Sequence, residues 1–233
     1  MDEKKERNVI YTTVISTKNA IDIPKNFEKM KNWDYILFTN LDKNIFSNTP
    51  WTVVNVNKEF PCNIMSARYI KWVGNELLNS YDNLVWIDAY IILDNEKEEE
   101  FNNIINSNNI VFKEHPFRKC IYDECNAVIV HNKDTKFKVS INKGIFIREK
   151  MPKKYGLIET NIIMYKNTTE NREFFKKVFT FMVNKSHRDQ LSLTYNIWKY
   201  NFKNFKKLPY DYIKSFIKSI NYSNLHNMSH YNT

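Results

Sequence analysis

The chain contains few of the residues that mark several classes of protein. Its 233 residues include three glycines, six prolines and three cysteines. So little glycine excludes a collagen-like repeat and a flexible glycine–serine linker. No stretch approaches the roughly 18 uninterrupted apolar residues that a transmembrane helix needs. The charged start, residues 1–7, leads directly into an apolar run and lacks the pattern of a secretory signal.

The number and spacing of the cysteines indicate the kind of cellular compartment. Cys62, Cys120 and Cys125 are odd in number and lack the CxxC spacing of a metal site. Cys120 and Cys125 are spaced to lie about one turn apart on a helix. We therefore expect free thiols in a soluble, cytoplasmic chain from a reducing compartment.

Apolar residues and lysines are abundant. Hydrophobic residues make up 42% of the chain and aromatic residues 15%, which excludes disorder as the main state. The formal net charge is +9, with −4 in residues 1–100 and +13 in residues 101–233. The 33 Asn, 29 Lys and 26 Ile all have A/T-rich codons, so a low-GC genome explains part of the lysine excess. The C-terminal half is either a solvated basic face or a surface that attracts phosphates and acidic glycans.

Apolar runs alternate with helical patterns along the chain. The runs predict strands at 8–16, 34–39, 51–56, 84–87, 91–93, 110–112 and 157–165. Helical periodicity predicts helices at 64–78, 96–107, 171–184, 186–199 and 210–220. Strands that alternate with helices predict an α/β fold, with a mostly parallel central sheet flanked by helices. We expect a single domain over 1–233, with its core at about 8–200 and a C-terminal helix and tail at 201–233. In such folds ligands bind beyond the carboxyl ends of the strands.

One acid ends a buried strand. Asp88 follows the apolar run 84–87, where an ionised carboxylate needs a cation or donor nearby. The alternative is an aspartate that only forms the turn. Upstream, Arg68 and Lys71 lie three residues apart in a predicted helix, a spacing that suits a diphosphate or sugar hydroxyls. A solvated helix stripe would have the same spacing.

Further polar clusters follow other predicted elements. A loop with a fixed proline brings together His115, Arg118 and Glu124, as either a site loop or a surface loop. Glu159 and Asn161 stand early in an apolar strand, which is hard to explain as surface. Ser186 is a candidate helix N-cap, which would place Asp189 in the first turn of that helix, with either a capping or a functional role.

Four motifs in this order resemble a known family. They are Val-Trp-Ile-Asp-Ala (85–89), Glu-His-Pro-x-Arg-x-Cys-Ile-Tyr-Asp-Glu (114–124), Gly-Leu-x-Glu-x-Asn (156–161) and Arg-Asp-Gln-Leu-Ser (188–192). Together they are similar to the glycosyltransferase-like domain, once catalogued as of unknown function, of plant pectin- and mucilage-related proteins, bacteria and large viruses. The resemblance covers about residues 8–198. More distantly, the chain resembles GT-A enzymes of the glycogenin and lipopolysaccharide-galactosyltransferase type.

The resemblance implies a GT-A-like, Rossmann-like domain that moves a sugar from a nucleotide-sugar, with a UDP-sugar favoured, to a glycan, protein or lipid hydroxyl. It implies a Mn²⁺ or Mg²⁺ ion on the diphosphate, held by Asp88 and His230, with His226 as a substitute. The remaining roles fall into three groups. Donor binding falls to Tyr11, Thr12, Thr13, Ser16, Arg68, Lys71, Asp88 and Tyr90. Acceptor or diphosphate contacts fall to His115, Arg118 and Gln190, and catalysis to Asp189 and Glu159.

Two positions depart from the GT-A pattern. Tyr90 replaces the second metal-binding acid, and Leu191 replaces the last acid of an Asp-Gln-Asp motif. Arg68, Lys71 and Arg118 are then alternative sources of positive charge for the diphosphate. Whether transfer retains or inverts the sugar configuration stays open. So does a non-catalytic nucleotide-sugar-binding relative with a decayed metal site.

A third class, nucleic-acid binding by the basic half, lacks support. Aromatic residues are sparse among its lysines, with Phe137 and Phe146 the examples, and no DNA- or RNA-binding motif is present. We expect no nucleic-acid partner. An acidic or phosphate-bearing acceptor is the expectation that the charge asymmetry leaves.

Overall fold

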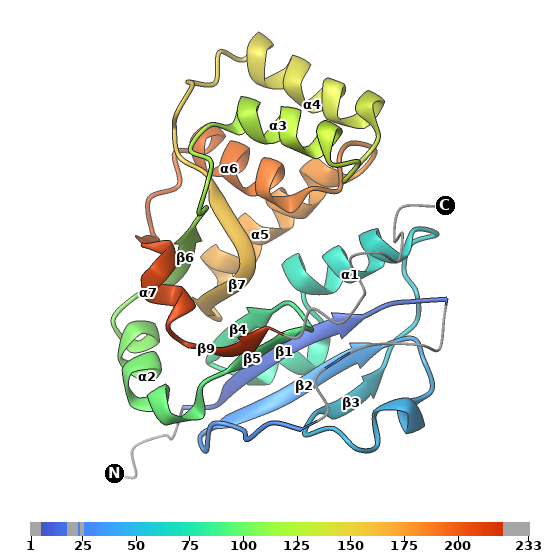
Figure 1. The fold of residues 1–233 in the computed structure, drawn as a ribbon, viewed down its shortest axis with the longest axis vertical. Coiled ribbons are helices and arrows are strands. Elements are labelled where there is room, and N and C mark those ends of the chain that lie inside the picture. Colours follow the sequence, from blue (N-terminus) through green and yellow to red (C-terminus); the bar gives the residue numbers. More distant parts are fainter. Residues whose placement is uncertain (1–5, 18–22, 24–25, 221–233) are drawn as a thin grey trace.

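A twisted sheet crosses the molecule (Figure 1). The structure is a computed structural model that describes residues 6–17, 23 and 26–220. In the described residues the sheet has seven strands in the order β3-β2-β1-β4-β7-β6-β8, and a second sheet pairs β5 with β9. The strands are β1 Asn8–Val14, β2 Trp33–Thr39, β3 Thr52–Asn55, β4 Asn83–Ile87, β5 Ile91–Leu93, β6 Ile110–Glu114, β7 Ile158–Lys166, β8 Lys206–Leu208 and β9 Ile217–Ile220.

Strand direction decides which residues meet at the edge of the sheet. β7 is antiparallel to both neighbours, β4 and β6, whereas the other described pairs of the large sheet are parallel. The carboxyl ends of β4 and β6 therefore lie at the same edge as the amino end of β7. The predicted α/β class, with a mostly parallel central sheet flanked by helices, is confirmed.

Helices cover both faces of the sheet. The α-helices are α1 Asn63–Trp72, α2 Glu98–Asn106, α3 Ile121–Val130, α4 Lys136–Arg148, α5 Thr169–Met182, α6 Asp189–Lys199 and α7 Tyr210–Lys214. Short 3-10 helices are η1 Lys43–Phe46, η2 Glu76–Ser80 and η3 Asn95–Lys97. None of the helices in the described ranges is long and apolar enough to cross a membrane.

Alternate residues of the strands enter two cores. Val9 and Tyr11 of β1 pack with α1, α5 and α6 on one face. Ile10 points to the other face, where α2 and α7 supply Phe101 and Ile213. Because both faces are buried, the central strands are continuous apolar runs rather than alternating ones.

A third core lies beyond the sheet. Residues of α3 and α4, among them Cys125 and Phe146, pack against Leu191 and Tyr195 of α6. Figure 1 shows α4 as the outermost helix of this group, at the end of the molecule away from β2 and β3. Cys62, Cys120 and Cys125 are free thiols, as predicted.

Several predicted elements differ from those observed. The helix expected at 64–78 ends at Trp72, because Gly74 has a φ of +89°, and η2 follows. The C-terminal helix expected at 210–220 is the short α7 followed by β9. α3, α4 and β8 had not been expected as elements. β8 pairs with β6, so the central sheet includes part of the stretch expected to be a tail.

Candidate functional site

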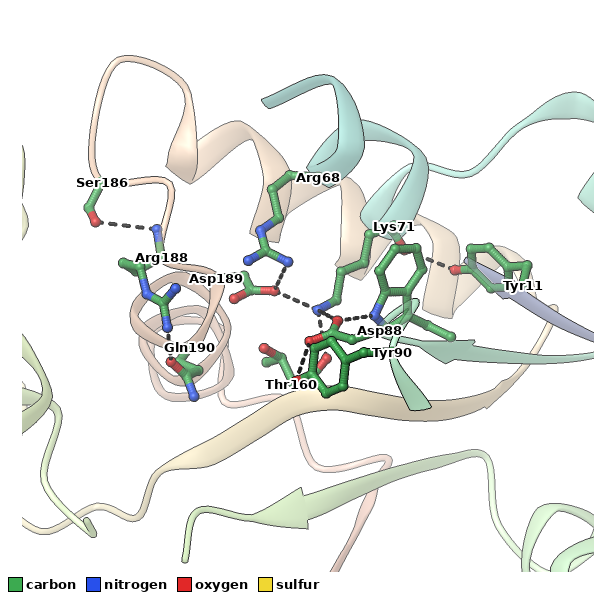
Figure 2. A network of polar contacts seen from close by, with 11 residues as sticks. Tyr11, Arg68, Lys71, Asp88, Tyr90, Thr160, Ser186, Arg188, Asp189 and Gln190 are labelled. Atoms are coloured by element: carbon green, nitrogen blue, oxygen red, sulfur yellow. Dashed lines mark hydrogen bonds and ion pairs between the residues drawn. The ribbon is translucent and has the colours of Figure 1, made fainter. Parts of the chain in front are cut away.

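A network of charged side chains lies where β4 ends and β7 begins (Figure 2). Asp88 follows β4, and its backbone N–H donates to Asn161 O of β7 at 2.9 Å. Helix α1 supplies Arg68 and Lys71, and Asp189 is the first residue of α6. The structure thus brings together groups that are far apart in sequence, at the edge where α/β sheets bind ligands.

Lys71 is at the centre of the network. Its side chain is 1% exposed, and Nζ donates to Asp189 Oδ2 at 2.7 Å and to Thr160 O at 2.6 Å. Asp88 Oδ1 is 3.9 Å from the same Nζ, and the centroid of the Trp86 ring is 5.0 Å away. Burial lowers the pKa of Lys71 below its usual value, and Asp189 is the main opposing influence.

Asp189 balances two cations. Arg68 Nη1 lies 2.9 Å from Asp189 Oδ2, the oxygen that also accepts from Lys71. Burial alone would raise the pKa of Asp189, but the charges of Arg68, Lys71 and Arg188 hold it well below its usual range. The N-terminal position on α6 also favours a negative charge. Asp189 is therefore ionised, and its basicity is low.

The position of α1 depends on a buried tyrosine pair. Tyr11 Oη donates to Lys71 O at 2.9 Å, and the Tyr11 and Tyr165 hydroxyls are 2.9 Å apart. Tyr11 and Thr12 are fully buried, and Thr13 is half-buried. In this structure Tyr11 supports the site from the core. Donor contacts for these three residues stay a prediction, as they do for Ser16, whose backbone N–H donates to Asn40 Oδ1 at 2.9 Å.

Both oxygens of Asp88 accept hydrogen bonds. Trp86 Nε1 donates to Oδ1 at 3.0 Å, and Tyr90 Oη donates to Oδ2 at 3.2 Å (Figure 2). The Asp88 side chain is 28% exposed, so a ligand can reach it.

The described ranges contain no group of three His, Cys, Asp or Glu residues that could hold a metal ion. Asp88 is therefore a single, already bonded carboxylate, which is a poor fit to a divalent cation on its own. His230 and His226 lie outside the described residues, so the predicted metal ligands stay a prediction.

A second cluster follows β6 at the same edge. Lys113, the buried fourth residue of β6, places Nζ 2.7 Å from Glu159 Oε2 of β7. The Glu159 side chain is 23% exposed, whereas that of Asp189 is 2% exposed. Arg118 forms an ion pair with the buried Glu124 of α3, and its Nη2 is 3.1 Å from His115 Nε2.

His115 fixes the loop between β6 and α3. Its Nδ1 accepts from the backbone N–H groups of Phe117 at 3.2 Å and Arg118 at 3.0 Å. Burial, reinforced by the charges of Arg118, Lys113 and Arg188, lowers the pKa of His115 to about 4. Gln190 Oε1 accepts from Arg188 Nη2 at 3.1 Å.

Some contacts of the site were not expected. Lys113 belongs to the predicted cluster around His115, but its ion pair with Glu159 was not predicted. The contacts of Trp86 and Thr160 with Asp88 and Lys71 have no signal in the sequence. Ser186 was expected to cap α6, but α6 begins at Asp189 with Arg188 as N-cap. Ser186 instead accepts from the Arg188 N–H at 3.3 Å and donates to Asp134 at 2.8 Å.

Comparison with known proteins gives matches among solved structures alone. A scan against protein-family models gave no match, and a search of curated proteins gave none. Among solved structures, the chain is similar to the apo structure of WbbM, a bifunctional glycosyltransferase, with 12% sequence identity and a TM-score of 0.48. The match covers 89% of this chain and 39% of that chain, so this chain spans well under half the length of that protein.

Proposed function

We propose that this chain is a glycosyltransferase, which moves a sugar from a nucleotide-sugar donor to an acceptor hydroxyl. The observation that carries the proposal is the buried Lys71 ammonium, placed with Arg68 between Asp88 and Asp189 at the ligand-binding edge of the sheet. Sugar transfer leaves a nucleoside diphosphate, and the negative charge that develops on it needs preorganised positive groups. Lys71 and Arg68 meet this requirement.

The two predicted catalytic acids have different roles in this proposal. Asp189 is buried and of low basicity, so it orients Arg68 and Lys71 rather than exchanging a proton. Glu159 is more exposed and lies at the same edge, so it is the group that orients or deprotonates the acceptor hydroxyl. Lys113 holds the Glu159 carboxylate in place.

The donor and the ion belong to the proposal as well. The motif resemblance favours a UDP-sugar, and a glycan, protein or lipid as acceptor. A Mn²⁺ or Mg²⁺ ion, if bound with help from His230, would add positive charge at the diphosphate. The contacts of Asp88 with Trp86 and Tyr90 favour a second candidate, a nucleotide-sugar-binding relative without transfer activity.

The test measures binding and release of nucleoside diphosphate over a panel of UDP- and GDP-sugars, with and without Mn²⁺ and with a chelator. We expect Glu159→Gln to bind the donor like the unchanged chain and to slow transfer at least 100-fold. Glu173→Gln, on the exposed surface of α5, is the matched control and should change neither.

The outcomes separate the two candidates. Binding that is insensitive to the chelator, with no transfer to water or to any acceptor, would support the non-catalytic relative. If no donor binds or turns over, and Asp88→Ala and Asp189→Ala behave like the unchanged chain, both candidates are wrong.

A further inference from the structure

Helix α4 has apolar side chains on two opposite faces. Its inner face places Val139 and Phe146 in the third core, where both are fully buried. Its outer face exposes Phe137 by 75% and Ile147 by 60%, and Val130 at the adjoining end of α3 is 74% exposed. Packing within the chain explains why the inner positions are apolar. It does not explain why the exposed outer positions are apolar.

Positive charge surrounds these exposed side chains. The thirteen residues of α4 include four cations, Lys136, Lys138, Lys143 and Arg148, and no acid. Lys136, Lys138 and Arg148 are exposed, and the exposed Lys150, Lys153 and Lys154 follow the helix. We call Phe137, Ile147, Lys136, Lys138 and Arg148 the cationic apolar face.

The shape of this face is open. Small residues, Ser140 and Gly144, lie exposed between Phe137 and Ile147. A Cβ added at Gly144 would meet no atom within 4 Å. Figure 1 shows α4 at the outer end of the molecule, with α3 and α6 on its inner side. The whole length of the helix, about 20 Å for thirteen residues, can therefore lie against a flat surface.

We propose that the cationic apolar face binds the surface of an anionic phospholipid bilayer. Phe137 and Ile147 enter between the lipid headgroups, and the lysines and Arg148 contact the phosphates. A helix in the plane of the interface needs this combination of exposed apolar residues, cations and no acid. Nucleic acid would match the cations but would leave Ile147 and Val130 without a function. The proposal does not depend on the transferase activity.

The test uses the full chain and sedimentation with vesicles of phosphatidylcholine containing 30% phosphatidylglycerol, or of phosphatidylcholine alone. We expect binding to the anionic vesicles that weakens as NaCl is raised from 50 to 500 mM, because salt screens the charges. Each Lys or Arg at an anionic surface contributes about fivefold in affinity. Lys136→Gln with Lys138→Gln should therefore weaken binding about 25-fold.

A second variant tests the apolar part. Phe137→Ser with Ile147→Ser should weaken binding at least tenfold and leave the thermal midpoint of unfolding nearly unchanged, because both side chains are exposed. Lys43→Gln with Lys58→Gln, in exposed segments beside β2 and β3, has the same change in charge and should bind vesicles like the unchanged chain.

Three results would overturn the proposal. They are an absence of binding to the anionic vesicles, equal losses in the control and in the α4 variants, and full binding by the Phe137 and Ile147 variant. Two parallel measurements, of self-association and of oligonucleotide binding, test whether another partner binds this face. If these variants abolish self-association in sedimentation or binding to an oligonucleotide, and vesicle binding is absent, the face serves that partner instead.

Discussion

At the scale of single residues, the site is a buried set of charges that balance one another. Asp189 accepts from both Arg68 and Lys71 through one oxygen, and Lys71 has no other anion closer than Asp88 among the described residues. Breaking such a buried set by removing one charge is far more harmful than its net contribution suggests. The balance links the stability of the fold to the proposed binding site.

We predict that Asp189→Asn lowers the free energy of unfolding by about 3–5 kcal/mol, because the buried Lys71 and the partly buried Arg68 lose their counter-charge. Urea denaturation followed by circular dichroism measures this change. Lys71→Met is the comparison, and its effect should be smaller because Asp189 keeps Arg68 as a partner. Equal losses in the two variants would contradict the charge-balance interpretation.

His115 makes stability depend on pH in a defined window. Its pKa is lowered from 6.5 to about 4 in the folded chain, so between these values the unfolded chain binds more protons. Its contribution is fully present above pH 6.5 and is lost as the pH falls towards 4, by about 2–3 kcal/mol in total.

Urea titrations at pH 7, 6, 5 and 4 measure this dependence. His115→Asn keeps an acceptor for the Phe117 and Arg118 N–H groups and removes the titration. A curve for His115→Asn as steep as that of the unchanged chain would show that other groups cause the dependence.

At the scale of elements, the turn into β7 sets the position of Glu159. Gly156 precedes the strand with a φ of +107°, and its N–H donates to Lys119 O at 3.0 Å. A side chain at this position is strained by the backbone, and a Cβ would approach Lys207 Nζ to 3.1 Å. Gly144 in α4 is the opposite case, because a Cβ there meets open space.

We predict opposite effects of the same substitution at these two glycines. Gly156→Ala should destabilise the chain by more than about 1 kcal/mol, whereas Gly144→Ala should stabilise it by about 0.5–1 kcal/mol. Chemical denaturation of both variants under the same conditions makes the comparison. A stable Gly156→Ala variant would mean that the turn can adopt another conformation.

The sequence predicted those helices and strands in which the apolar residues follow one clear pattern. The central strands are apolar throughout because both sheet faces are covered, and they were predicted within a few residues. α4 was missed because apolar residues on both of its faces hide the helical period. β8 was missed because Lys206–Leu208 is a short edge strand with two lysines. Asp88, Arg68, Lys71 and Asp189 were found as separate motifs, but their contacts depend on strand order, which spacing does not reveal.

At the scale of the whole molecule, two cores line the sheet and a third lies outside it. The third core joins α3 and α4 to α6 and contains no residue of a strand. Cooperative units with fewer shared contacts open at lower free energy than the global transition. The molecule should therefore open in stages.

We predict that amides of α3 and α4 exchange with deuterium faster than those of β1 and β4, which are buried at the centre of the sheet. Hydrogen exchange measured by mass spectrometry on peptides from both regions compares them. Equal protection would show that the three cores unfold together.

The antiparallel course of β7 has a further consequence for this third core. Residues 115–157 leave the sheet at the end of β6 and return to the same edge, where the His115 N–H donates to Leu157 O at 3.0 Å. The two ends of the segment therefore lie next to each other at the edge of the sheet, beside Lys113 and Glu159. The length of this segment can therefore change without altering the order of the sheet strands, β4 among them, that position Asp88.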